Sequence, residues 1–283
     1  MAPKVKKASG IGFCMGVRRA IDILEQVAAE RGGVETLGAV VHNQQVLKRL
    51  AEAGVSIVDS VDEIEGKLVV VSSHGVSPQV IEEIKRRDIE VVDTTCAFVK
   101  RAQVAARRLA ESGFYTIVFG DAGHPEVKGI LGWADGKGVA TKNVQELADI
   151  EKLPRRLGVL SQTTQIPSEF ARFARDIIGT ALVKDSELRI IDTVCHDIRR
   201  RQADTLKLAE ESDLIFVVGG KTSANSHHLV ELCSSVAETH LIQTADDIKK
   251  EWLAGKENIG VTSGASTDEQ TIDEVIARLE AMA

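Results

Sequence analysis

The sequence predicts an α/β fold of three pseudo-repeated units, each a small parallel sheet with flanking helices, around a central cavity. Two observations support this prediction. Nearly the same tetrapeptide is written twice, as DTTC at residues 93–96 and as DTVC at residues 192–195. Each copy is followed by the same alternation of helical and strand-like segments, and the N-terminal part of the chain repeats that alternation.

The first unit is expected over residues 10–92 and begins with a cysteine ahead of a helix. Cys14 precedes the helical pattern within GIGFCMGVRRAIDILEQVAAERG. Three segments follow: a strand ending in Gly and His, a short strand that leads into a helix start, and a closing strand. They are VETLGAVVHNQQV, VSIVDSVDEIEG and KLVVVSSHGVS. Alternating strands and helices favour a parallel sheet with helices packed on it.

The second and third units are expected over residues 93–191 and 192–283. The second contains, in order, CAFVKRAQVAARRLAESG, YTIVFGDAGHPEV, GVATKNVQELADI and LGVLSQTTQ. The third contains CHDIRRRQADTLKLAEES, LIFVVGGKTSANS, HLIQTADDIKKEW and IGVTSGAST. Residues 1–9 precede the first unit, and we expect them to associate with the third.

The repeat brings polar residues into register. The cysteines that precede the helices are equivalent: Cys14, Cys96 and Cys195. At the end of the second strand-like segment we align His42, His124 and Asn225, and at the end of the closing strand His74, Thr163 and Ser266. Ligands of parallel α/β sheets bind beyond the carboxyl ends of the strands. Three units around one axis would therefore point all these side chains into one cavity.

Composition excludes several classes of protein. The chain has 283 residues, 43% hydrophobic and 27% charged, and a formal net charge of −7, which argues against a basic nucleic-acid-binding surface. No apolar run approaches the roughly 18–20 residues of a membrane span, and the N-terminus lacks the pattern of a signal peptide. We therefore expect a cytoplasmic protein, in a reducing compartment where cysteines seldom form disulfides.

Three thiols in register indicate a shared metal centre. One reading is a zinc site with three cysteines and an open position. An iron–sulfur cluster fits equally, and three ligands for a four-iron cube would leave one iron free to bind a substrate. The ordinary alternative is that each cysteine is a small buried residue. We apply that interpretation to Cys233, which lies at helical spacing and has no counterpart in the other units.

The side chains around the cysteines are suited to binding an anion. Ser, Asn and His beside strand-end amides make a phosphate cradle, and the candidates are His42, Asn43, His74, His124, Ser223, Asn225 and Ser266. Any one of them could simply stabilise a turn. Glu126 is the carboxylate beside this set, and inside a cavity it would be the natural proton carrier. We assign ordinary surface or core roles to His196, His227, His228 and His240.

The motifs resemble a known family. GFCMGV, VVHN, SSHGVS, DTTC, GHPEV, SQTT, DTVC, KTSANS and GVTSGAS, in this order between about residues 10 and 270, resemble the 4-hydroxy-3-methylbut-2-enyl diphosphate reductases of the non-mevalonate (MEP) isoprenoid pathway. The resemblance implies an iron–sulfur oxidoreductase that removes a hydroxyl from an allylic diphosphate. The implied products are isopentenyl and dimethylallyl diphosphate, in the last step of that pathway.

The resemblance also implies roles for individual residues. Cys14, Cys96 and Cys195 would hold a 4Fe–4S cluster with one iron not bound by a cysteine. The diphosphate would be held by His42, His74, His124, Ser223, Asn225 and Ser266. Glu126, Thr163 and His124 would handle the substrate hydroxyl and its proton, with Thr164 beside them. An external donor such as ferredoxin or flavodoxin would supply electrons, since the chain has no G-x-G-x-x-G fingerprint.

Two positions depart from the family pattern. Ala224 stands where the family usually has a second serine, so one hydroxyl contact to the diphosphate is missing, although the Ala224 amide could still donate. Asp268 stands where the family often has proline, at the turn after Ser266. Two other functions remain open on the residues alone: a colourless zinc hydrolase of a phosphorylated substrate, and a non-enzymatic iron–sulfur sensor. The visible spectrum and a turnover assay would distinguish them.

Overall fold

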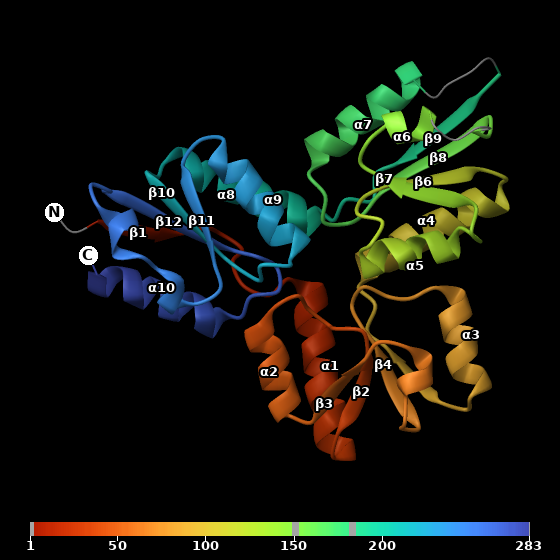
Figure 1. Cartoon of the computed structure of the whole chain (residues 1–283), viewed down its shortest axis with the longest axis horizontal. Coiled ribbons are helices and arrows are strands. Elements are labelled where there is room, and N and C mark those ends of the chain that lie inside the picture. Colours follow the sequence, from red (N-terminus) through yellow and green to blue (C-terminus); the bar gives the residue numbers. More distant parts are fainter. Residues whose placement is uncertain (1–2, 149–152, 181–184, 283) are drawn as a thin grey trace. The chain divides into compact units, whose positions relative to one another are not determined.

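The computed structural model describes residues 3–148, 153–180 and 185–282. It contains three parallel four-stranded sheets with flanking helices, which confirms the predicted fold class (Figure 1). All strand pairs in the described residues are parallel, as expected for strands joined by helical crossovers.

The first sheet has the order β3-β2-β4-β5. Its strands are β2 (Val34–Leu37), β3 (Val55–Val58), β4 (Leu68–Val71) and β5 (Glu90–Asp93). The helical elements along this part of the chain are α1 (Met15–Arg31), α2 (Gln44–Glu52), the short 3₁₀ helix η1 (Val61–Glu63) and α3 (Pro78–Arg86). Ser77 begins α3 by accepting the Val80 N–H, and Pro78 occupies the first helical position, where a missing N–H costs nothing.

The second sheet has the order β7-β6-β8-β9. Its strands are β6 (Tyr115–Phe119), β7 (Gly138–Thr141), β8 (Arg156–Ser161) and β9 (Glu187–Ile191), and its helices are α4 (Ala97–Glu111), α5 (Pro125–Trp133), α6 (Gln145–Ala148) and α7 (Pro167–Thr180). Alternate residues of each strand serve opposite faces. Val118 and Leu160 pack with α4 and α5, whereas Ile117 and Val159 pack with α7.

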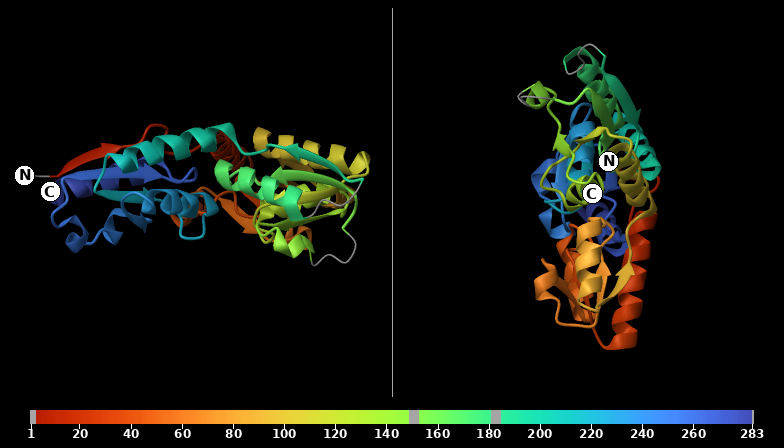
Figure 2. Two further views of the ribbon diagram at one scale, coloured as in Figure 1. Left: turned by 90° about the horizontal axis from the view of Figure 1, so that it is seen from above. Right: turned by 90° about the vertical axis from the view of Figure 1, so that its right-hand side faces the viewer.

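The third sheet has the order β1-β12-β10-β11 and contains the first and the last strand of the chain. Its strands are β1 (Lys4–Lys7), β10 (Leu214–Val218), β11 (Glu238–Ile242) and β12 (Asn258–Ser263), and its helical elements are α8 (His196–Glu210), α9 (Ala224–Ser234), η2 (Ala245–Asp247), η3 (Lys250–Leu253) and α10 (Glu269–Met282). Phe216 faces α10, and Ile215 and Val217 face α8 and α9, so helices cover both sides (Figure 2).

The three sheets share one connection rule. Each contains three strands that follow one another in the chain, with the first of them in the interior of the sheet, and a fourth strand that leads to a cysteine. Strand β5 precedes Cys96, β9 precedes Cys195 and β1 precedes Cys14. The cysteines therefore mark the points where the chain leaves one sheet for the helix of the next.

By contacts, the described chain forms two compact units. The first comprises residues 1–18, 41–52 and 196–283, and the second comprises residues 19–40 and 53–195. The three boundaries expected from the repeat remain a prediction. No helix in the described ranges combines the length and the apolarity that crossing a bilayer would require.

Candidate functional site

The three predicted cysteines occupy the same structural position. Each directly precedes a helix: Cys14 precedes α1, Cys96 precedes α4 and Cys195 precedes α8. Each cysteine N–H donates to a carbonyl just past the end of a closing strand. The acceptors and N···O distances are Ala265 at 3.0 Å for Cys14, Ser73 at 3.0 Å for Cys96 and Thr163 at 2.9 Å for Cys195. The expected equivalence of the cysteines is therefore visible in the backbone.

The duplicated tetrapeptide is hydrogen-bonded to the end of the neighbouring strand. The Thr94 hydroxyl donates to the Val71 carbonyl at 2.6 Å, and the Thr193 hydroxyl donates to the Ser161 carbonyl at 2.5 Å. The aspartate that starts each copy accepts the N–H two residues on, at 2.9 Å for Asp93 and 3.1 Å for Asp192. Such local side-chain bonds hold the backbone that presents the cysteine.

The first cysteine is held by different residues, which explains why the tetrapeptide occurs only twice. The Gly12 N–H donates to Ser263 Oγ at 2.9 Å, and Arg201 donates to the Gly12 carbonyl at 2.7 Å. Arg201 is buried and also bonds Asp197 at 3.1 Å. A serine and an arginine from the third sheet and its helix thus replace the threonine of the other two copies.

Each of the three thiols lies directly before the N-terminus of a helix. A helix N-terminus favours negative charge, and the Val17 N–H donates to Cys14 Sγ at 3.4 Å. Cys233 differs: it is fully buried in α9 among apolar residues, and burial raises the pKa of its thiol to about 12. Three thiols at helix starts fit the ligand preference of an iron–sulfur cluster, and Cys233 fits the expected structural role.

The backbone corrects the alignment at the closing strands. Since Ser73, Thr163 and Ala265 accept from the three cysteines, they are equivalent, and the residues in register one position later are His74, Thr164 and Ser266. The predicted alignment of Thr163 with His74 was therefore wrong by one residue. Strand pairing agrees with this correction, because Val71 and Ser161 are the last paired residues of β4 and β8.

The alignment at the starts of α2, α5 and α9 is corrected too. The helices begin with a side chain that accepts a backbone N–H of the first turn: Asn43 from Gln45 at 3.1 Å, His124 from Glu126 at 3.1 Å and Ser223 from Ser226 at 3.3 Å. Asn225 is thus equivalent to Glu126, and not to His124 as predicted. In α2, Gln45 occupies this same second position. The sequence analysis did not mark this residue.

Glu126 is a buried carboxyl bound to one threonine. It is 2% exposed, and Thr163 donates to it twice, from its N–H at 2.6 Å and from its hydroxyl at 2.9 Å. Burial raises the pKa of Glu126 to about 7, against the lowering effect of the Thr163 bonds. The cap of its own helix is His124, which accepts the Glu126 N–H, so the carboxyl itself bonds Thr163. Near neutral pH this carboxyl can exist with or without its proton.

Two of the three histidines, His42 and His124, have neutral rings. His124 Nδ1 accepts the Glu126 N–H, which places the imidazole proton on Nε2. His74 and His124 lie edge to face, with ring centroids 5.2 Å apart. Burial lowers the pKa of His42, so its imidazole is neutral at pH 7. All three follow the carboxyl end of a parallel strand, where ligands of such sheets bind.

The start of α9 collects polar groups that lack protein partners. Asn225 is 5% exposed, and neither atom of its amide has a hydrogen-bond partner among the described residues. Ser226 fills the space above two glycines: its Oγ lies 2.3 Å and 2.4 Å from where a Cβ would stand at Gly219 and Gly264. Ala224 is the first helical residue, so its N–H has no partner within the helix. Buried amides without protein partners normally bind water or a polar ligand.

The second departure from the family pattern has a local explanation. Asp268 accepts the Thr271 N–H at 2.8 Å and the Thr271 hydroxyl at 3.0 Å. It directly precedes α10, which begins at Glu269. The aspartate is therefore an N-cap that fixes the turn after Ser266.

The predicted site residues divide between the two compact units. The first unit contains Cys14, His42, Ser223, Ala224, Asn225 and Ser266. The second unit contains His74, Cys96, His124, Glu126, Thr163, Thr164 and Cys195. Within the second unit the structure brings Glu126 against Thr163 and His74 against His124.

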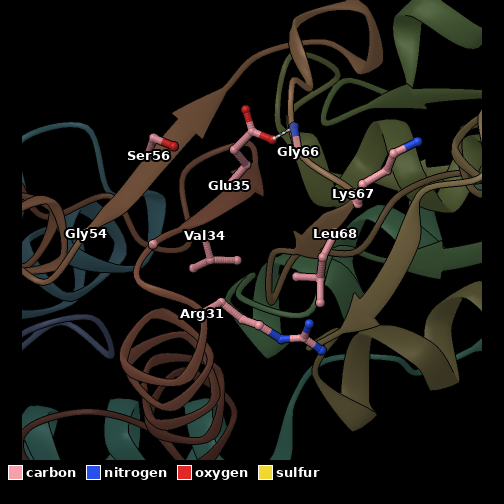
Figure 3. Close-up of a pocket in the computed structure, with 9 residues that line it drawn as sticks. Arg31, Val34, Glu35, Gly54, Ser56, Gly66, Lys67 and Leu68 are labelled. Atoms are coloured by element: carbon pink, nitrogen blue, oxygen red, sulfur yellow. Dashed lines mark hydrogen bonds between the residues drawn. The ribbon is translucent and has the colours of Figure 1, made fainter.

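A separate hollow of about 400 Å³ opens at the other end of the first sheet (Figure 3). Gly33, Gly54 and Lys67, which line it, directly precede β2, β3 and β4, so it lies at the amino ends of these strands. Glu35 accepts the Gly66 N–H there at 2.8 Å. No predicted site residue lines the hollow, and we assign it no role.

Comparisons with known proteins agree with the motifs. A family profile described as "LytB protein" matches residues 5–280. A 4-hydroxy-3-methylbut-2-enyl diphosphate reductase of Dehalococcoides mccartyi is 60% identical over 98% of both chains, and one of Geobacter metallireducens is 39% identical over 96% of this chain and 95% of that protein.

Two solved structures have similar folds. One is that of an (E)-4-hydroxy-3-methyl-but-2-enyl diphosphate reductase, described as the terminal enzyme of the non-mevalonate pathway. It is 32% identical, with a TM-score of 0.71, over 99% of this chain and 100% of that one. The other is the E-1-hydroxy-2-methyl-but-2-enyl-4-diphosphate reductase of Plasmodium falciparum. It is 26% identical, with a TM-score of 0.91, over 98% of this chain and 88% of that one.

Proposed function

The chain belongs to the LytB protein family, and from this premise we propose that it is a 4-hydroxy-3-methylbut-2-enyl diphosphate reductase. The reaction removes the allylic hydroxyl of the substrate with two electrons and two protons. It yields isopentenyl and dimethylallyl diphosphate and water, the last step of the non-mevalonate isoprenoid pathway. Full-length identity to reductases of this name supports the activity, and the buried Glu126–Thr163 pair is the observation in the fold that carries the proposal.

The family is one of iron–sulfur enzymes, and the chain has a donor set that fits such a cofactor. We propose that Cys14, Cys96 and Cys195 hold a 4Fe–4S cluster in which one iron lacks a cysteine ligand. The supporting observation is their shared position before a helix with a common backbone bond. When bound, the cluster supplies the electrons and a Lewis-acidic iron for the substrate hydroxyl.

The diphosphate is assigned to neutral donors and backbone amides. We propose that it is bound by His42, His74, His124, Ser223, Asn225 and Ser266, with the Ala224 N–H and the Thr164 hydroxyl beside them. Asn225 supports this assignment because its buried amide has no partner in the described part of the chain. The first turn of a helix also favours an anion, through its unpaired N–H groups. Holding the diphosphate fixes where the hydroxyl at the other end of the substrate lies.

Glu126 is assigned the proton transfer. At neutral pH about half of a carboxyl with a pKa of about 7 carries a proton, which suits a general acid. Its two oxygens contact the N–H and the hydroxyl of Thr163. The Thr163 hydroxyl can therefore receive a proton from Glu126 and pass one to the departing oxygen. The neighbouring His124, held through Nδ1 by the Glu126 N–H, presents its Nε2–H for donation.

The electrons come from outside the chain. We propose that an external protein such as a ferredoxin or a flavodoxin delivers them. We also propose a cytoplasmic location, because a reducing compartment keeps cluster-binding thiols from forming disulfides. None of the four cysteines, all of which lie in the described residues, forms a disulfide in the structure.

The experiment that tests this function combines a spectrum with an assay. Protein purified without oxygen should be brown, with absorption near roughly 400 nm from thiolate–iron bonding, and should contain iron and sulfide. With a reduced donor it should convert the allylic diphosphate to the two products. Serine at position 14, 96 or 195 should lose iron, whereas Cys233→Ser should keep it. A colourless zinc protein that hydrolyses phosphate esters would contradict the proposal, as would a cluster protein without turnover.

A further inference from the structure

Gln45 occupies in α2 the position that Glu126 occupies in α5 and Asn225 in α9. Each lies two residues after the side chain that caps the helix, which is Asn43, His124 or Ser223. Glu126 and Asn225 are already assigned to the substrate by their motifs. The same position in the first helix carries an amide that no motif marks.

The side chain of Gln45 has an unmet requirement for a hydrogen bond. Its Oε1 is buried, and no described residue bonds it. In the same compact unit, both amide atoms of Asn225 are buried without a partner among the described residues. Burying an amide oxygen without a partner is unfavourable, so groups of this kind normally bind water or a ligand. Two such amides at equivalent helix positions point to a common polar ligand.

The backbone just before α2 lies against the loop that leads to α9. The His42 carbonyl oxygen lies 1.8 Å from where a Cβ would stand at Gly220, and the Asn43 Cα lies 3.5 Å from it. Gly220 accepts the Ser223 N–H at 3.0 Å in the turn that starts α9. Only glycine permits this approach, which places the residues that lead into α2, just before Gln45, against the loop that leads to Asn225.

From these observations we infer that Gln45 is a further diphosphate-binding residue of this enzyme. The buried atom of Gln45 is its oxygen, which only accepts, but the two ends of an amide have nearly the same shape. Turning the amide puts its NH2 group, with two donors, in that position when the partner is an acceptor. An anionic oxygen at the starts of α2 and α9 can accept from the Gln45 amide as from the Asn225 amide. The inference rests on the proposed function, and it adds a specificity contact that comes from α2.

Binding of inorganic diphosphate to the cluster-containing protein tests the inference without turnover. Gln45→Ala should weaken binding at least about tenfold, the loss expected for one hydrogen bond to a charged group. Gln45→Glu should weaken it further, because a carboxylate would face the anion. Gln44→Ala is the matched control: this exposed neighbour in the same helix turn should bind diphosphate as the wild type does.

Each outcome distinguishes the inference from the function on which it rests. Both Gln45 variants should keep iron content and the thermal midpoint, and should raise KM with little change in kcat. Wild-type diphosphate affinity in Gln45→Ala and Gln45→Glu, with weakened binding in Asn225→Ala, would overturn the role of Gln45 alone. Unchanged affinity in the Asn225 variant as well would place the anion elsewhere and remove the proposed substrate site. A lower melting temperature with unchanged affinity would make Gln45 structural.

Discussion

At the scale of single residues, Glu126 shows how the fold prepares one group for chemistry. Its carboxyl is nearly inaccessible to water, and two bonds from Thr163 are its partners in the described structure. Burial disfavours the charged form more than these bonds favour it, so the pKa rises to about 7. A surface glutamate would be ionised at neutral pH and could not serve as an acid.

Replacing Glu126 by Gln should remove the acidic proton while keeping the size of the side chain. The amide keeps the size of the side chain and can still bond Thr163, but it has no acidic proton. We expect the iron content and substrate affinity to be retained and turnover to fall at least about a hundredfold. The measurement is single-turnover reduction beside iron analysis. The control is Glu111→Gln, a change at an exposed carboxyl on α4. A near-normal rate in Glu126→Gln would assign the proton to a histidine or to the diphosphate.

The raised pKa also makes stability depend on pH. The folded protein binds the Glu126 proton more tightly than the unfolded chain does, because the pKa is raised from its ordinary value of 4.5 to about 7. The free energy of unfolding contributed by this group is therefore present below pH 4.5 and lost as pH rises to about 7, on the order of 3 kcal/mol. Denaturant titrations should show the stability of Glu126→Gln, relative to wild type, increasing from about pH 5 to about pH 8. A constant difference would mean that the carboxyl has an ordinary pKa.

At the scale of elements, part of the site could be predicted and part could not. The equivalent positions of the three cysteines could be predicted because each precedes a helical pattern that can be recognised in the sequence. The exact alignment of residues between the three units could not be predicted, because it is defined by backbone hydrogen bonds that the sequence does not show. The loop from β2 to the Asn43 cap is one residue longer than those from β6 to His124 and from β10 to Ser223. Gln45 and the close packing at Gly220 depend on that register, so they required the structure.

Gly220 offers a test of how the starts of α2 and α9 are held together. In Gly220→Ala the new methyl would overlap the His42 carbonyl, so the first turn of α2 must move. We expect a loss of about 1–3 kcal/mol in the free energy of unfolding and weaker diphosphate binding. Gly179→Ala is the control, because no atom lies within 4 Å of where its Cβ would stand in α7 and alanine favours a helix. Wild-type diphosphate affinity in Gly220→Ala would mean that the loop at Gly220 does not contribute to the anion site.

At the scale of the whole molecule, the proposed cluster ligands come from both compact units. Cys14 belongs to the first unit, and Cys96 and Cys195 belong to the second. The sequence repeat predicts that three α/β units share one centre, and the sheets confirm the units themselves. The central cavity remains a prediction. If all three thiols bind one cluster, that cluster is a bond between parts of the chain that are far apart in sequence.

Removing the cluster should therefore weaken the coupling between the two compact units. Binding to the folded state stabilises it, and a cofactor bound by both units stabilises them jointly. In calorimetry the cluster-containing protein should unfold in one transition at a higher temperature. After chelation, the transition should move down and broaden or split into two. Cys14→Ser should behave like the chelated protein, because it removes the only proposed ligand of the first unit, while Cys233→Ser should retain the wild-type response to chelation. Identical transitions before and after iron removal would mean that the cluster does not join the units.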